Sequence, residues 1–203
     1  MTTLGTDEKL ELNKNAKLAL ASMFSAMAAV ITLLNLTIPF PILPYLKIDL
    51  TEIPVILSFY LLNPVYGLLT ATIYWVILTM RAGNLLGPAM KYSAVVSMIL
   101  GYWAVERLGI GNKNVQLIYG LVLGSVVRII VMSVVNYYVI VFVAPYYLDF
   151  ITGLLSATGL PSSNRLEVMT WTLIITGVYN LVHSMLSILP AYYLTQLIRK
   201  RLG

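Results

Sequence analysis

The chain has 203 residues, of which 59% are hydrophobic and 10% are charged, and its mean hydropathy is +0.86. A soluble domain usually carries about 25% charged residues, so this composition excludes an ordinary water-facing surface and indicates an integral membrane protein. The absence of cysteine excludes a disulfide, a zinc–thiolate site and a thiol nucleophile. The lysines and arginines behind the net charge of +5 concentrate near expected helix ends, which favours membrane orientation over nucleic-acid binding.

Six apolar segments are candidates for membrane-spanning helices, which need about 20 residues each. They cover residues 17–36, 52–62, 65–80, 88–108, 115–146 and 168–201. The first ends at the proline-rich sequence TIPFPILPYL and is expected to be a retained helix, because no cleavage site follows it. The second and third are short, so we expect a tight antiparallel pair, or a tilted helix beside one that stops short.

The distribution of positive charge predicts the orientation of these helices. Six crossings place three basic clusters on one side of the membrane, and these clusters hold eight of the 13 basic residues: Lys9, Lys14 and Lys17; Arg107 and Lys113; Arg199, Lys200 and Arg201. We therefore expect an all-α membrane protein, a single domain over residues 1–203, that forms a six-transmembrane-helix bundle with both termini cytoplasmic. Its location would be the plasma membrane, as a multi-pass protein.

A polar stripe follows the last expected helix. Its side chains are spaced by 4, 4, 3, 1 and 3 residues, which places them on one helical face: Thr172, Thr176, Asn180, His183, Ser184 and Ser187. Hydrocarbon tolerates such a stripe only at a high free-energy cost. The stripe should therefore face protein or a water-filled cavity.

Asn136, in the expected fifth helix, is predicted to lie at nearly the same depth as Asn180. It precedes Tyr147 by 11 residues, and Asn180 follows Val168 by 12. At about 1.5 Å per residue, both amides should lie about 16–18 Å from the outer ends of two antiparallel helices. Carboxamides offer a donor and an acceptor without a charge, so the pair predicts an outward-opening pocket for a flat ligand with C=O and N–H groups. Interhelical hydrogen bonding without a ligand is the alternative.

Three further ionisable side chains lie within apolar segments. His183 has no carboxylate nearby in sequence, which makes it weak evidence for proton chemistry. Arg128 could be functional, or could pair with a backbone carbonyl or with Glu106. Lys91 is expected near the outer end of its helix, where it could extend to the interface or reach the rim of the pocket.

The outer loop PFPILPYLKIDLTEIP is rich in proline and carries Lys47, Asp49 and Glu52. One interpretation is a rigid lid with polar groups over the pocket. The other is a plain helix connection, in which Asp49 or Thr51 caps the next helix and Glu52 favours its positive end. The two interpretations are compatible.

Small residues spaced by four follow the first helix at Ala21, Ser25 and Ala29, and again at Ser22 and Ala26. Small residues at this spacing let another helix approach closely. The helix they meet could belong to the same bundle or to another membrane subunit, which would dock on Ala21, Ser25 and Ala29.

Catalysis is disfavoured by what the apolar segments lack. No Asp or Glu lies in an expected helix core, no G-x-S-x-G occurs, and the chain has a single histidine, so neither a nucleophile–base pair nor a metal site is expected. No G-x-x-x-x-G-K-[ST] occurs either, so the chain should not hydrolyse ATP by that mechanism. We expect no enzyme, metal or cofactor. A structural membrane subunit without a ligand remains an alternative from a different class.

Three pieces of the sequence resemble a known family: PYLKIDLTEIPVIL at 44–57, RIIVMSVVNYYVIVFVAPYY at 128–147 and YNLVHSMLSILPAYYL at 179–194. They are similar to the substrate-binding S-components of energy-coupling factor (ECF) vitamin transporters, and most of all to the riboflavin-specific type. The resemblance covers nearly the whole membrane region. His183 departs from it, because the riboflavin type more often has lysine there.

The resemblance implies a binding subunit that captures riboflavin near the outer face, with another flat heterocyclic vitamin as the alternative. Asn136 and Asn180 would meet the pyrimidine edge of the flavin, with His183 beside them, and Lys47 and Asp49 would meet the ribityl hydroxyls. Ala21, Ser25 and Ala29 would dock on a membrane-embedded coupling subunit that works with a pair of ATPases.

Overall fold

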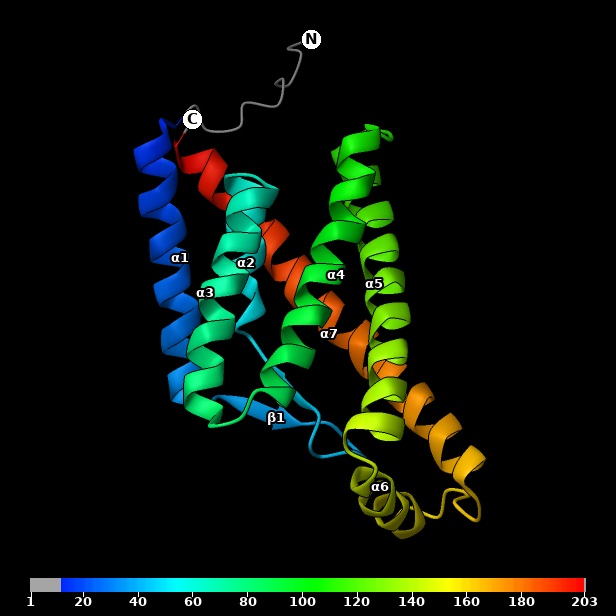
Figure 1. Ribbon diagram of the computed structural model, residues 1–203. Helices are drawn as coiled ribbons and strands as arrows, with labels where there is room; N and C mark the ends of the chain where they lie inside the picture. Colours follow the sequence, from blue (N-terminus) through cyan, green and yellow to red (C-terminus); the bar gives the residue numbers. More distant parts are fainter. Residues whose placement is uncertain (1–11, 203) are drawn as a thin grey trace.

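The computed structural model describes residues 12–202 as a bundle of helices with one short hairpin (Figure 1). The helices are α1 Lys14–Leu34, α2 Glu52–Leu61, α3 Pro64–Ala82, α4 Leu86–Leu108, α5 Lys113–Tyr138, the π-helical turn η1 Val139–Val143, α6 Tyr146–Ala157 and α7 Arg165–Leu202. Strands β1 Thr37–Pro39 and β2 Lys47–Asp49 pair antiparallel, with Ile38 opposite Ile48. Residues 37–49 are called the hairpin below.

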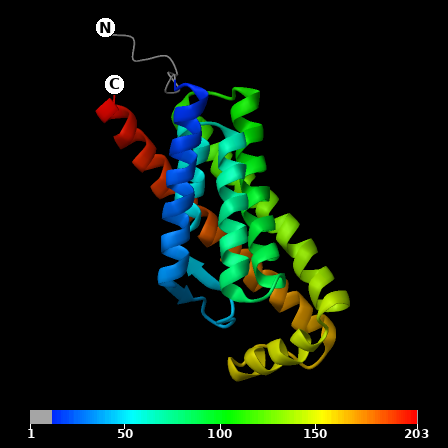
Figure 2. The same ribbon diagram turned by 60° about the vertical axis from the view of Figure 1, so that its left-hand side comes forward.

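The start of α1, the connection from α4 to α5 and the end of α7 lie at one end of the bundle, and the hairpin and α6 lie at the other (Figure 1). Helix α7 crosses the bundle obliquely, and α6 lies across its end (Figures 1 and 2). Among the described residues, four helical segments are long and apolar enough to cross a membrane: Lys14–Leu34, Pro64–Ala82, Lys113–Val143 and Arg165–Arg201. The chain is thus a mostly helical membrane protein.

Each of the six expected segments contains a helix, but the sequence analysis was wrong about residues 139–167. The expected fifth helix, 115–146, is divided: α5 ends at Tyr138, η1 continues to Val143, and α6 begins after Pro145. Hydropathy gave no signal for this division because the run stays apolar through Tyr147. The hairpin was also missed, because its two strands have only three residues each.

Local signals explain several of the helix ends. Asn63 caps α3, because its side-chain oxygen accepts hydrogen bonds from the backbone N–H groups of Val65 and Tyr66. Pro64 suits the first helical position, where no intrahelical partner awaits an N–H. Gly83 and Gly109 end α3 and α4 in the left-handed conformation that glycine adopts without strain.

Two hydrophobic cores lie at different levels of the bundle. The larger one joins α1, α2, α3, α4 and α7, and includes the edge-to-face pair Phe59–Tyr102. The smaller one joins the tip of the hairpin to η1, α6 and the start of α7, and Leu43 at this tip is fully buried. The hairpin is therefore held at its tip by apolar packing, separately from the main core.

Helices α4 and α5 approach closely at glycine. A Cβ added to Gly101 would lie 2.9 Å from the Cα of Gly124 and 2.9 Å from the carbonyl oxygen of Leu123. Both neighbours are backbone atoms, so a side chain at Gly101 could only be accommodated by separating the helices. This contact fixes α5, and with it Asn136 and Arg128, against α4.

Replacing Gly101 by Val should destabilise the protein by about 1–3 kcal/mol, because the added side chain overpacks the contact between α4 and α5. The measurement is the thermal unfolding midpoint of the detergent-purified protein. Gly153→Ala in α6 is the control, because nothing lies within 4 Å of its added Cβ. Equal midpoints for Gly101→Val and the unchanged protein would contradict the close approach.

Candidate ligand-binding site

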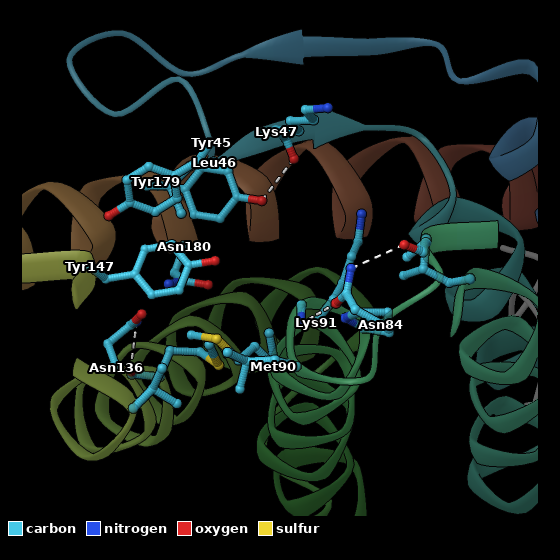
Figure 3. Close-up of a pocket in the computed structure, with 18 of the residues that line it drawn as sticks. Tyr45, Leu46, Lys47, Asn84, Met90, Lys91, Asn136, Tyr147, Tyr179 and Asn180 are labelled. Carbon is cyan, nitrogen blue, oxygen red and sulfur yellow. Dashed lines mark hydrogen bonds between the residues drawn. The ribbon is translucent and has the colours of Figure 1, made fainter. Parts of the chain in front are cut away.

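A cavity of about 770 Å³ lies at the hairpin end of the bundle, within the size range of small-molecule sites. It is lined by the hairpin, α5, η1, α6 and α7, and by the ends of α1 and α3 with the start of α4. The lining includes all ten residues labelled in Figure 3: Tyr45, Leu46, Lys47, Asn84, Met90, Lys91, Asn136, Tyr147, Tyr179 and Asn180.

The hairpin is held over the cavity by polar contacts. The Tyr179 hydroxyl donates to the Lys47 carbonyl at 2.8 Å. The Asp49 carboxylate pairs with Lys91 of α4 and accepts from the Thr51 backbone N–H at 3.0 Å. Lys91 therefore reaches the cavity and ties α4 to the hairpin, which resolves the alternatives left by the sequence. Of the two side chains expected to cap α2, Asp49 accepts the hydrogen bond from the Thr51 backbone N–H. The side chain of Thr51, at the start of α2, makes no capping hydrogen bond.

Asn136 and Asn180 both line the cavity and are nearly fully buried. The Asn136 side-chain N–H donates to the Met132 carbonyl at 2.7 Å, so its carboxamide oxygen is left for another partner. The Asn180 side-chain N–H donates to the Thr176 carbonyl at 2.8 Å. Its oxygen accepts from Arg128 Nε at 2.9 Å. Each amide is thus anchored by its own helix and keeps unused hydrogen-bonding capacity.

The predicted distance of about 16–18 Å between each amide and the outer end of its helix is wrong for both residues. Asn136 lies seven residues before Val143, where η1 ends, and Asn180 lies 15 residues after Arg165, where α7 begins. At about 1.5 Å per residue, their distances from the helix ends are about 10 Å and about 22 Å. They line the same cavity because α7 crosses the bundle obliquely (Figure 2).

A buried ion pair lies at the inner side of the cavity. Arg128 NH1 and NH2 bind Glu52 Oε2 and Oε1 at 2.7 and 3.1 Å, and the two side chains are 1% and 0% exposed. The expected pairing of Arg128 with Glu106 or with a backbone carbonyl is therefore wrong. Glu52 is also a carboxylate inside the bundle, which the sequence analysis did not expect. Its position in the first turn of α2 favours the negative charge.

His183 belongs to this buried network and is not among the cavity-lining residues. Its Nε2 lies 3.2 Å from the Asp49 carbonyl oxygen and 3.5 Å from Glu52 Oε1. Its Nδ1 lies 3.3 Å from Arg128 NH2. Since arginine only donates and carbonyl oxygen only accepts, the Arg128 and Asp49 contacts favour the neutral imidazole with the proton on Nε2. Nδ1 also lies 3.1 Å from the Tyr179 hydroxyl. His183 links the ion pair to the hairpin.

Four tyrosines line the cavity, Tyr45, Tyr146, Tyr147 and Tyr179, and Figure 3 labels all but Tyr146. Tyr137 and Tyr138 are not among them, because both are exposed on the outside of α5. Tyr45 lies on the hairpin, outside the spanning helices. Burial, and then the neighbouring Tyr147, raise the pKa of its phenol, so it stays protonated and can donate a hydrogen bond at neutral pH.

The residues proposed for partner docking do not form an accessible surface. Ala21 and Ser25 are buried in the bundle, and Ala29 is partly buried. Small residues on this face serve internal packing, the alternative that the sequence left open. Ser22 and Ala26, with the same spacing, are exposed on the other face of α1.

A family model described as "ECF transporter, substrate-specific component" matches residues 16–195. The riboflavin transporter RibU of Staphylococcus aureus (strain TCH60) is 32% identical over 133 residues, which cover 65% of this chain and 69% of that protein. The riboflavin transporter FmnP of Bacillus subtilis (strain 168) is 31% identical over 180 residues, which cover 83% of this chain and 90% of that protein.

A solved structure of the S component of a bacterial ECF transporter has the same fold. The TM-score is 0.72 at 26% sequence identity, over 94% of this chain and 99% of the other.

Replacing Arg128 alone by Met should destabilise the protein by about 3–5 kcal/mol, because Glu52 is then left buried without a counter-charge. The double variant Glu52→Gln/Arg128→Met removes both charges and should recover most of the loss. Thermal unfolding in detergent measures both, with Arg165→Met, at an exposed position, as the control. A double variant that is no more stable than Arg128→Met would contradict the pairing.

Proposed function

The chain belongs to the substrate-specific components of ECF transporters, and we propose that its cavity binds riboflavin for uptake. The observation that carries the proposal is that two anchored carboxamides, Asn136 and Asn180, share one cavity with four tyrosines. Two relatives named as riboflavin transporters support the same ligand. Another flat heterocyclic vitamin is the alternative, because His183 stands where the riboflavin type more often has lysine and because amides bind many such rings.

In the proposed complex, the isoalloxazine ring lies among Tyr45, Tyr147 and Tyr179, with its pyrimidine edge toward Asn136 and Asn180. That edge presents C=O, N–H and C=O in sequence, which matches groups that donate and accept without carrying charge. The ribityl chain extends toward Lys47 and the start of α4, where Asn84 offers a further polar side chain. Asp49 contributes by fixing Lys91 and the hairpin. His183 does not touch the ligand in this complex; it helps to hold the hairpin through its contact with the Asp49 carbonyl.

Transport requires partners that carry the energy-coupling step. We propose that the chain docks on a membrane-embedded coupling subunit that works with a pair of ATPases. The chain passes between the two sides of the membrane six times, through α1, α2, α3, α4, α5 with η1, and α7, with the ten-residue α2 too short to span the hydrocarbon core alone. Both termini are cytoplasmic and the hairpin is external. This orientation places the cavity at the outer face, where the vitamin is captured, and it needs no catalytic residue, metal or cofactor.

Riboflavin should bind the detergent-purified protein, and Asn136→Ala and Asn180→Ala should each weaken binding by at least about tenfold, because a polar group of the ligand is left unpaired. Equilibrium dialysis with tritiated riboflavin measures the dissociation constants. Asn15→Ala, at an exposed position near the start of α1, is the control and should bind as the unchanged protein does. Wild-type affinity in Asn180→Ala would show that the site is assigned wrongly.

The proposed orientation can be tested with single cysteines, since the chain has none of its own. Ser163→Cys, between α6 and α7, should react with a membrane-impermeant maleimide in intact cells. Lys200→Cys, near the end of α7, should react only after the membrane is broken. Labelling of Lys200→Cys in intact cells would place the end of α7 outside and overturn the orientation.

A further inference from the structure

Arg128 lines the cavity, yet all five of its N–H donors are used inside the protein. NH1 donates to Glu52 and to the sulfur of Met98, and NH2 donates to Glu52 and faces Nδ1 of His183. Nε donates to the Asn180 carboxamide oxygen at 2.9 Å. Because no donor is left over, the guanidinium does not supply a hydrogen bond to a ligand in this arrangement. Its influence on a ligand passes through Asn180.

The contact with Arg128 determines which way the Asn180 amide points. A guanidinium has no acceptor, so a flipped amide would bring its NH₂ group against Nε–H. The oxygen must therefore face Arg128, and one N–H is engaged by the Thr176 carbonyl at 2.8 Å. The N–H that remains is the only donor that the Asn180 carboxamide can offer the cavity without giving up the Arg128 contact.

Asn136 completes the pattern from α5. One N–H of its carboxamide donates to the Met132 carbonyl at 2.7 Å, and the carboxamide oxygen is left as the acceptor beside the second N–H. The cavity thus presents a donor on α7 and an acceptor on α5. A ligand edge that carries a carbonyl beside a ring N–H matches both.

We propose that Arg128, fixed by Glu52, is a positioning residue that sets ligand selectivity by holding the Asn180 amide with its N–H toward the cavity. Asn180 then requires a hydrogen-bond acceptor on the ligand and rejects a donor at the same place. The inference rests on the proposed function, because it takes the pyrimidine edge of riboflavin as the group that meets Asn180.

The test compares riboflavin with its two analogues in which one pyrimidine carbonyl is replaced by an amino group. The readout is the ratio of the dissociation constants of analogue and riboflavin, which a purely structural role of Arg128 would not change. The wild-type protein should bind at least one analogue more weakly by about tenfold or more, because its amino group then faces the Asn180 N–H and the neighbouring ring nitrogen, which has lost its proton, faces the Asn136 oxygen. Asn180→Asp keeps an oxygen toward Arg128 but offers a second oxygen to the cavity, and should invert this preference.

In the double variant Glu52→Gln/Arg128→Met the Asn180 amide is free to turn, so the ratio should fall toward one. Thr195→Ala is the matched control, because Thr195 is equally buried on α7 and its hydroxyl donates to the Ala191 carbonyl of the same helix at 2.8 Å. It should keep the wild-type ratio.

A wild-type ratio near one, or an Asn180→Asp protein that still prefers riboflavin, overturns the inference even if the double variant does not fold. A folded double variant with an unchanged ratio overturns it as well. Failure of the wild-type protein to bind riboflavin at all would instead overturn the proposed function.

Discussion

The ion pair between Glu52 and Arg128 is the contact on which the cavity depends. It joins the first turn of α2 to the middle of α5, and both charges are removed from water. Burial of two charges costs several kcal/mol per ion and is tolerated only where their remaining hydrogen bonds are satisfied. Here Ser187 donates a further hydrogen bond to Glu52. Asn180 and His183 take up the donors of Arg128 that Glu52 leaves. The network thus links three helices at the level where the cavity begins.

The same network connects the cavity floor to the hairpin that covers it. His183 lies between the ion pair and the Asp49 carbonyl, and Tyr179, one turn earlier on α7, holds the Lys47 carbonyl. The apolar tip of the hairpin packs separately, against η1, α6 and the start of α7. The hairpin therefore has an apolar attachment at its tip and a polar attachment at its base. A change that displaces His183 or Tyr179 therefore alters the position of the hairpin and the geometry of the cavity together.

The sequence predicted the parts of this arrangement that depend on hydropathy and on the cost of polar groups in hydrocarbon. Asn136 and Asn180 stood out because amides are rare in apolar helices, and the polar stripe on α7 indicated a protein-facing surface. The partner of Arg128 could not be predicted, because Glu52 lies 76 residues away and a helix pattern does not specify contacts between helices. Tyr147 was missed because α6 follows η1 within one continuous apolar run, and Tyr45 was missed because the strands of the hairpin are only three residues long. The predicted distances of the amides from the helix ends were wrong because α7 crosses the bundle obliquely, but the two amides do line one cavity.

The most direct test of this account is a high-resolution structure of the protein with riboflavin bound. We predict the isoalloxazine ring beside Asn136 and Asn180, with Glu52 still paired to Arg128 and the Asn180 oxygen still on Arg128 Nε. A ring bound elsewhere, or an Arg128 that leaves Glu52 to contact the ligand itself, would contradict the account.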